Sequence, residues 1–198
     1  MALRLGISGG LGSGKTAFAR ALERRGVPVF FADDEAKRLY DVDDTLRADL
    51  VATFGPETFR PDGAFDRPRM AARVFSDAEA LARLNALVHP RVFAAWQRFA
   101  DAHGDAPVVA HESAILYESG GDAHVDVVVW IDAPRETRIA RALARDPHLT
   151  RADVEQRLAR QLDPAEARGR ADFVVDNTGS LAALDAHADR VLNALRLA

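Results

Sequence analysis

Short apolar runs alternate with longer segments of helical periodicity along this chain. The apolar runs predict strands at residues 3–8, 27–32, 107–111, 125–131 and 172–175. The segments between them predict helices near residues 15–25, 34–53, 77–102, 134–145, 151–161 and 180–196. Strands that alternate with helices favour right-handed crossovers and a mostly parallel sheet. The run at 127–131 lacks polar alternation, which is typical of a strand covered by helices on both faces.

Two segments interrupt this alternation. Residues 33–106 separate the second and third predicted strands, far more than a simple crossover needs, and predict a helical insertion at about 34–104. The Arg-rich stretch at about 146–166 is too polar to be core throughout and predicts a lid. The remaining residues, about 1–33, 105–145 and 167–198, then form the core of a single domain.

Composition limits the functional classes. The chain has 198 residues, 48% of them hydrophobic, and a net charge of -4, which argues against general nucleic-acid binding. It has no cysteine, so disulfides and thiolate metal sites are excluded. We see no apolar run of membrane-spanning length and no signal-peptide pattern, so we expect a cytoplasmic protein, monomeric or a weak homo-oligomer.

A glycine-rich segment, Gly9-Gly10-Leu11-Gly12-Ser13-Gly14-Lys15-Thr16, follows the first predicted strand and opens the first predicted helix. It fits G-x-x-x-x-G-K-[ST], the phosphate-binding P-loop. Glycines let the backbone close around an anion, and successive N–H groups with the helix N-terminus form a nest for phosphate oxygens. We expect Lys15, exposed at the loop–helix junction, to reach the β- and γ-phosphates, and the Thr16 hydroxyl to help hold Mg²⁺. The expected nucleotide contacts are Leu11, Gly12, Ser13, Gly14, Lys15 and Thr16.

The P-loop leaves several classes of nucleotide-binding protein open. An Asn-Lys-x-Asp motif, usual in guanine-selective GTPases, does not occur. Asp132, directly after the apolar run 127–131, would suit an ATPase that organises Mg²⁺ and water there. A kinase needs an acceptor site and a cover that excludes water, and the insertion and the lid supply both. The architecture favours a kinase, and the alternative from another class is a nucleotide-responsive binding protein.

Two aspartates follow the second predicted strand. The carboxyl ends of parallel strands share one edge of the sheet, so Asp33 should emerge on the same edge as the P-loop. A carboxylate there can accept a hydroxyl proton as the phosphoryl group arrives. Either Asp33 or Asp34 can instead cap the next helix. The residues alone leave both roles open: Asp34 is the candidate cap, and the family resemblance described below favours catalysis for Asp33.

The sequence resembles the dephospho-CoA kinase family nearly from end to end. The segments that carry the resemblance are residues 7–16, 32–33, 54–55, 62–63, 73–77, 84–90, 116–118, 125–126 and 145–146, Arg157 with Gln161, and 171–179. The P-loop marks only a superfamily, whereas Leu84-Asn85-Ala86-Leu87-Val88-His89-Pro90 and Asp176-Asn177-Thr178-Gly179 are far more specific. The resemblance implies transfer of the ATP γ-phosphate to the 3′-hydroxyl of dephospho-CoA, which gives CoA and ADP in the final step of coenzyme A biosynthesis. It also implies an α/β P-loop nucleoside triphosphate hydrolase-like fold, with a parallel sheet of about five strands and helices on both faces.

Two positions depart from the family pattern. Phe31 stands where the family often has the first Asp of Asp-Ala-Asp, while Asp33 matches the second, the expected base. The family's Pro-Leu-Leu-x-Glu becomes Ala114-Ile115-Leu116-Tyr117-Glu118, which loosens the turn and retains Glu118, an expected acceptor contact.

Arginines of one helical stripe are further candidates. Arg141 lies one turn from Arg138 and Arg145, and its planar fork suits phosphate oxygens. We expect Arg141 to act in catalysis with Lys15 and Asp33, and Arg145 to bind substrate; the alternative is a solvated helix face.

Three polar residues at predicted element ends have both a structural and a functional interpretation. The resemblance to related nucleotide kinases implies that Asn177 lies beside adenine; the alternative is a turn residue before Gly179. The family resemblance implies that His89 binds the acceptor; the alternative is a structural histidine at the end of a helix, which Pro90 should end at Val88. Glu112 can lie near the phosphates after the third predicted strand, but we favour a position that faces solvent.

Overall fold

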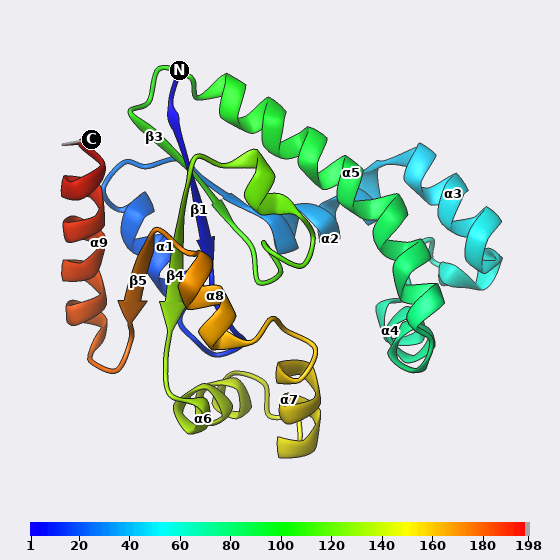
Figure 1. The fold of residues 1–198 in the computed structure, drawn as a ribbon. Helices are drawn as coiled ribbons and strands as arrows, with labels where there is room; N and C mark the ends of the chain where they lie inside the picture. The colour runs from blue at the N-terminus through cyan, green and yellow to red at the C-terminus, as the bar shows by residue number, and fades with distance from the viewer. Residues whose placement is uncertain (197–198) are drawn as a thin grey trace. The chain divides into compact units, whose positions relative to one another are not determined.

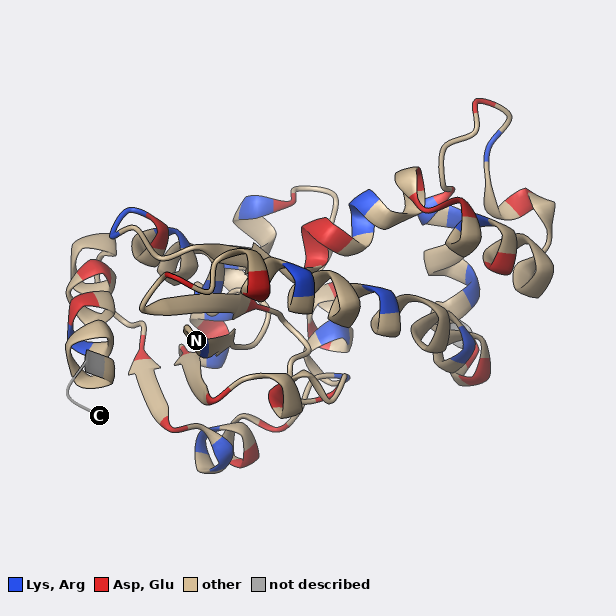
Figure 2. Cartoon of the chain, turned by 90° about the horizontal axis from the view of Figure 1, so that it is seen from above, with Lys and Arg blue, Asp and Glu red and all other residues tan. Residues whose placement is uncertain are grey.

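The computed structural model describes residues 1–196. The chain divides into two compact units, residues 32–98 and the remainder, and each is described by itself. Acidic and basic residues are interspersed along the helices (Figure 2). No helix within the described residues is long and apolar enough to cross a membrane.

A five-stranded sheet within residues 1–196 organises the larger unit (Figure 1). Its strands are β1 (Leu3–Ser8), β2 (Val29–Phe31), β3 (Val108–Glu112), β4 (Val127–Asp132) and β5 (Phe173–Asp176). The order is β2-β3-β1-β4-β5 and each pairing is parallel, which confirms the expected fold class. Because β1 is central, its neighbours β3 and β4 end beside the loop that follows Ser8.

Both faces of this sheet are covered. Successive residues of β4 point to opposite faces, and Val129 and Ile131 join one apolar cluster while Val128 and Trp130 join another. Helices α1 (Lys15–Glu23) and α9 (Leu181–Arg196) pack in the first cluster. Helix α8 (Pro164–Arg170) places Ala167 in the second cluster. The short η2 (Gly121–His124) also belongs to this unit.

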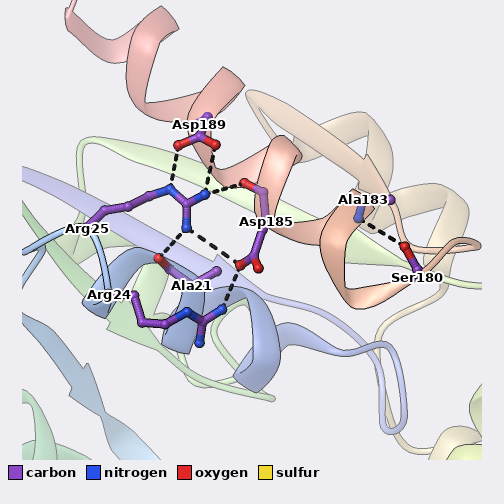
Figure 3. A network of polar contacts seen from close by, with 7 residues as sticks. All are labelled: Ala21, Arg24, Arg25, Ser180, Ala183, Asp185 and Asp189. Carbon is purple, nitrogen blue, oxygen red and sulfur yellow. Dashed lines mark hydrogen bonds and ion pairs between the residues drawn. The ribbon is translucent and has the colours of Figure 1, made fainter.

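An arginine clamp joins α1 to α9 (Figure 3). The Arg25 guanidinium donates to both carboxylate oxygens of Asp189, to the Asp185 carbonyl and to the Ala21 carbonyl. Arg24 donates to Asp185 Oδ1 at 2.6 Å. The hydrogen bonds from Arg25 lower the pKa of Asp189, so Arg25 and Asp189 stay a charged pair over the physiological range.

The predicted lid is a packed helical segment. Helices α6 (Arg135–Arg145) and α7 (Arg151–Leu158) enclose an apolar cluster of Ile139, Ala142 and Val154. A capping box between Thr150 and Asp153 starts α7. The expected helix at 151–161 ends at Leu158, and the sequence analysis missed α8, although Asp163 followed by Pro164 is a typical helix start.

The smaller unit is helical. Its elements are α2 (Ala32–Val42), α3 (Asp44–Phe54), η1 (Pro56–Thr58), α4 (Arg67–Ser76) and α5 (Ala78–Ala102), the last of which continues past residue 98. The single helix expected at 34–53 is wrong, because Asp43 is extended and its carboxylate caps α3 through the Leu46 N–H. The start of α2 at Ala32 also shortens the expected second strand, and it places Asp34 inside the first turn, where it pairs with Lys37 instead of capping.

The expectation that Pro90 ends a helix is also wrong. Pro90 lies inside α5, which runs from Ala78 to Ala102. A proline removes one backbone hydrogen bond and disfavours helical geometry at the preceding residue. Buried side chains lie on both sides of it, among them Val88 and Val92, and burial of this apolar stripe outweighs the local cost.

Candidate active site

Close packing explains the glycines of the P-loop. Gly12 and Gly14 have φ of 75° and 97°, which favours glycine. A Cβ on Gly12 would lie 2.2 Å from the Arg138 carbonyl oxygen, and one on Gly14 would lie 2.1 Å from Asn177 Nδ2. A Cβ on Gly10 would lie 2.0 Å from Arg138 Nη1. Helix α6 and the loop after β5 therefore press directly on the P-loop backbone.

The P-loop presents a set of backbone donors. The N–H groups of Gly12, Gly14, Lys15 and Thr16 donate to no acceptor within residues 1–196, whereas Ser13 N–H donates to the Gly10 carbonyl. Four unused donors at a helix N-terminus form an anion site. Leu11 N–H is already used, since it donates to Gln161 Oε1 at 2.8 Å.

Lys15 is buried, with only 8% of its surface exposed, so the expectation that it is exposed is wrong. The side chain forms no ion pair or hydrogen bond with another described residue. Lys15 lines a cavity, and a cation on a largely buried side chain without a carboxylate partner is costly unless a ligand supplies the negative charge. Its place at the start of α1 therefore suits an anion.

A hydroxyl and a carboxylate meet beside the P-loop. Glu112 ends β3, opposite Ile7 of β1, and is 3% exposed. The Thr16 hydroxyl donates to Glu112 Oε1 at 2.9 Å. Hydroxyl and carboxylate oxygens are ligands that Mg²⁺ prefers, so this pair fits one side of a magnesium site. No group of three or more His, Cys, Asp or Glu suited to a metal occurs in the described part of the chain, so any such ion would complete its shell with other oxygens.

Asn177 braces the P-loop. It is 7% exposed, and its Nδ2 donates to the Ser13 carbonyl at 2.7 Å. Its own N–H donates to the Asp132 carbonyl, and its carbonyl accepts from Arg141 Nη2 at 3.2 Å. Arg141 Nη1 lies 3.5 Å from the same Ser13 carbonyl. Asn177 therefore has a structural role in the loop, and its expected contact with adenine stays a prediction.

Most of the predicted nucleotide contacts share one cavity of about 200 Å³. It is lined by Gly12, Gly14, Lys15, Thr16, Ala17, Arg141 and Arg145. Its three cationic side chains, Lys15, Arg141 and Arg145, form no ion pair within residues 1–196. Arg141 donates only to backbone carbonyls. The cavity is therefore positive and suits a polyphosphate.

A larger cavity, about 680 Å³, is lined by residues of α6, α7, the start of α8 and the loops after β4 and β5. Two of its carboxylates are already paired, since Arg168 Nη1 donates to Asp132 and Asp176, each at 2.7 Å. Asp132 also accepts the Ala133 N–H. This pairing argues against the alternative in which Asp132 organises Mg²⁺ in an ATPase.

The residues expected to contact the substrate that accepts the phosphoryl group have different surroundings. The Glu118 carboxylate accepts the Leu162 N–H at 2.9 Å, so it fastens the end of the lid. In the smaller unit, Asp33 is exposed in the first turn of α2 and makes no hydrogen bond or ion pair with another described residue. His89 is half-buried, which lowers its pKa, and its ring centroid lies 6.2 Å from that of Phe93. The roles of these residues stay predictions.

Two functional candidates were undervalued or missed by the sequence analysis. Glu112 is buried, so the expectation that it faces solvent is wrong, and its position at the end of the strand beside β1 is the signal that finds it. Gln161 was noted only as part of the family pattern, because no local motif shows that a side chain from the lid reaches the P-loop.

Comparisons with known proteins show the family of the chain. A family model described as dephospho-CoA kinase matches residues 3–183. The dephospho-CoA kinase of Deinococcus radiodurans is 43% identical over 197 residues, covering 98% of this chain and 93% of its own. That of Salinibacter ruber is 42% identical over 179 residues, covering 89% of each chain.

Solved structures extend the comparison to the fold. A Thermus thermophilus protein, 34% identical, superposes with a TM-score of 0.83 over 98% of both chains. Dephospho-CoA kinase from Campylobacter jejuni, 23% identical, gives a TM-score of 0.71 over 98% of this chain and 96% of its own. Shikimate kinase from Acinetobacter baumannii gives 0.58 at 17% identity, over 98% and 93%, so the architecture is that of P-loop kinases.

Proposed function

The chain belongs to the dephospho-CoA kinase family, whose members transfer phosphate from ATP to an alcohol group, and we propose the residues that perform this reaction. The nest of four unused N–H groups, with Lys15 buried beside it, holds the β- and γ-phosphates of ATP. The observation that carries this proposal is Lys15 itself, a buried cation without a partner in the described residues.

Arg141 and Arg145 stabilise the charge that develops on the transferring phosphoryl group. Both line the P-loop cavity, and neither is neutralised by a carboxylate within residues 1–196. In a loose transition state, negative charge spreads over the equatorial oxygens, where a fixed guanidinium is most effective. Arg141 is already oriented by two backbone carbonyls, so it needs little reorganisation.

Thr16 and Glu112 would hold Mg²⁺. The hydroxyl and the carboxylate are adjacent and provide hard oxygen donors, and the remaining ligands would be phosphate oxygens and water. The ion would supply charge neutralisation between the β- and γ-phosphates. Glu112 is the part of this assignment that the P-loop motif alone does not contain.

Asp33 serves as the base for the acceptor hydroxyl. Its carboxylate lies two residues after β2, is exposed, and is not engaged by another described residue. Such a carboxylate can orient the 3′-hydroxyl of dephospho-CoA and take its proton. His89 of the insertion, about residues 34–104, would bind the acceptor, and Glu118 is a further proposed acceptor contact.

We propose that the enzyme works as a monomer or a weak homo-oligomer. Gel filtration over a range of concentrations tests this. A stable dimer whose dissociation abolishes transfer would contradict it.

The direct test offers dephospho-CoA, AMP and adenosine separately with ATP and Mg²⁺, and measures ADP release and the phosphorylated product. We expect transfer to dephospho-CoA, with CoA as product. Turnover on AMP without turnover on dephospho-CoA would assign the chain another nucleotide-like acceptor and overturn the proposal.

A further inference from the structure

Gln161, between α7 and α8, connects the lid to the P-loop. Its Oε1 accepts the Leu11 N–H at 2.8 Å, and its Nε2 donates to the Ala114 carbonyl at 3.2 Å. One partner can only donate and the other can only accept, so both require a primary amide in this orientation. One side chain thus joins the lid, the P-loop and the segment after β3.

Leu11 makes a second, independent connection to the lid. Its side chain packs against the apolar cluster that α6 and α7 form around Val154, which is fully buried. The backbone of Leu11 is held by Gln161 and its side chain by this cluster. A displacement of α7 would therefore disturb the P-loop at Leu11 through both contacts.

The adjacent residue strengthens the attachment. Leu162 N–H donates to Glu118 Oε1 at 2.9 Å, so two consecutive residues fasten the end of the lid to the core. Nearby, a Cβ on Gly10 would lie 3.4 Å from Gln161 Oε1, so the amide lies over the first half of the P-loop. The second half, from Gly12 to Thr16, carries the unused phosphate donors.

From these contacts we propose that Gln161 is a positioning residue that couples the lid to the P-loop. While the amide bridges Leu11 and Ala114, the lid stays over the loop and water is kept from the γ-phosphate. Loss of the bridge lets the lid leave the loop, and water competes with the acceptor. This inference rests on the proposed kinase function, since it concerns how ATP is divided between transfer and hydrolysis.

Two substitutions separate the parts of the bridge. Gln161→Met keeps a similar length but removes both hydrogen bonds. Gln161→Glu keeps an acceptor for Leu11 N–H, but it sets a carboxylate against the Ala114 carbonyl and adds negative charge beside the phosphate site. Gln156→Met is the matched control, because Gln156 is an exposed glutamine of α7 that makes no hydrogen bond to another described residue.

The experiment measures inorganic phosphate and phosphorylated acceptor in one reaction with ATP, Mg²⁺ and dephospho-CoA. We expect Gln161→Met to raise the ratio of hydrolysis to transfer about tenfold or more, the size expected for losing two net hydrogen bonds. Gln161→Glu should not restore the ratio, and Gln156→Met should match the wild type. In the presence of a non-hydrolysable ATP analogue, trypsin should also cut after the exposed Arg157 faster in Gln161→Met than in the wild type.

The outcomes distinguish this inference from the proposed function. If the wild type does not phosphorylate dephospho-CoA, the proposed function fails. If the wild type transfers, but Gln161→Met divides ATP as the wild type does, only the role of Gln161 is overturned. An equal rise in Gln156→Met would also overturn it. A lower melting temperature with an unchanged ratio would reduce Gln161 to a structural residue.

Discussion

Replacing Asp33 by Asn separates catalysis from structure at the acceptor side. The side chain is exposed in the first turn of α2 and touches no other described residue through a hydrogen bond or ion pair. Asn keeps its size and shape. The substitution loses only the attraction between a carboxylate and the helix N-terminus, about 0.3–1 kcal/mol at an exposed site. We therefore expect little change in the free energy of unfolding.

The expected effect on transfer is much larger. An amide cannot take the hydroxyl proton, and loss of a general base typically costs about 10²- to 10⁴-fold in rate. At 1.36 kcal/mol per tenfold, that is about 3–5 kcal/mol of activation free energy. Proton removal can come late in phosphoryl transfer, so part of this loss reflects orientation of the hydroxyl. ATP affinity should remain near normal, because the P-loop is unchanged.

The measurements are single-turnover transfer to dephospho-CoA and calorimetric ATP binding on the same preparation. Asp34→Asn is the matched control: it is adjacent, exposed and in the same first turn, so it loses the same attraction to the helix N-terminus and, in addition, a surface pair with Lys37 at 2.7 Å. A fall of less than about tenfold in Asp33→Asn, below the usual range for a general base, would refute the assignment. An equal fall in Asp34→Asn would also refute it, and Glu112 would become the next candidate base.

Three further predictions follow from buried groups. Lys15→Met should reduce kcat at least about a hundredfold, with no loss of thermal stability without nucleotide, because an unpaired buried cation is removed; near-normal turnover would remove Lys15 from the reaction. Glu112→Gln retains an acceptor for the Thr16 hydroxyl but loses the charge, so the Mg²⁺ concentration for half-maximal activity should rise about tenfold or more, and an unchanged requirement would exclude Glu112 as a ligand. Burial first, and the nearby His124 second, lower the pKa of His111 from 6.5 to about 4. Its contribution to stability is present above pH 6.5 and is lost as the pH falls toward 4. Between pH 7 and pH 5 the wild type should therefore lose about 2 kcal/mol more than His111→Gln in urea unfolding, and equal losses would contradict this.

The fold could be predicted because its signals are local. Each strand is a short apolar run between helical segments, and the run at 127–131 marks a strand buried on both faces. The P-loop is identified by glycines and Lys15, whose spacing follows from the shape of a phosphate. Asp43 and Pro90 were misjudged, since a cap inside a helical pattern and a proline inside a packed helix depend on tertiary burial.

The contacts that hold the P-loop in place could not be predicted from the sequence, because they join residues that are far apart along the chain. Asn177 reaches Ser13 across 164 positions, and Gln161 reaches Leu11 across 150. Both use side-chain amides on backbone groups, which leave no periodic pattern. Glu112 differs, since the position of its strand beside β1 follows from the sheet order, and a strand order predicted in advance would have placed it next to Thr16.

The acidic composition of the chain is compatible with an anionic substrate because charges act over short distances. The net charge is -4, yet the three cations of the P-loop cavity have no carboxylate partner within residues 1–196. At physiological salt the screening length is about 8 Å, so carboxylates elsewhere on the surface do not cancel their potential. Many other arginines are neutralised locally, as Arg25 is by Asp189 and Arg168 by Asp132. Positive charge is thus left available beside the unused N–H groups of the P-loop, where the phosphates of ATP are proposed to bind.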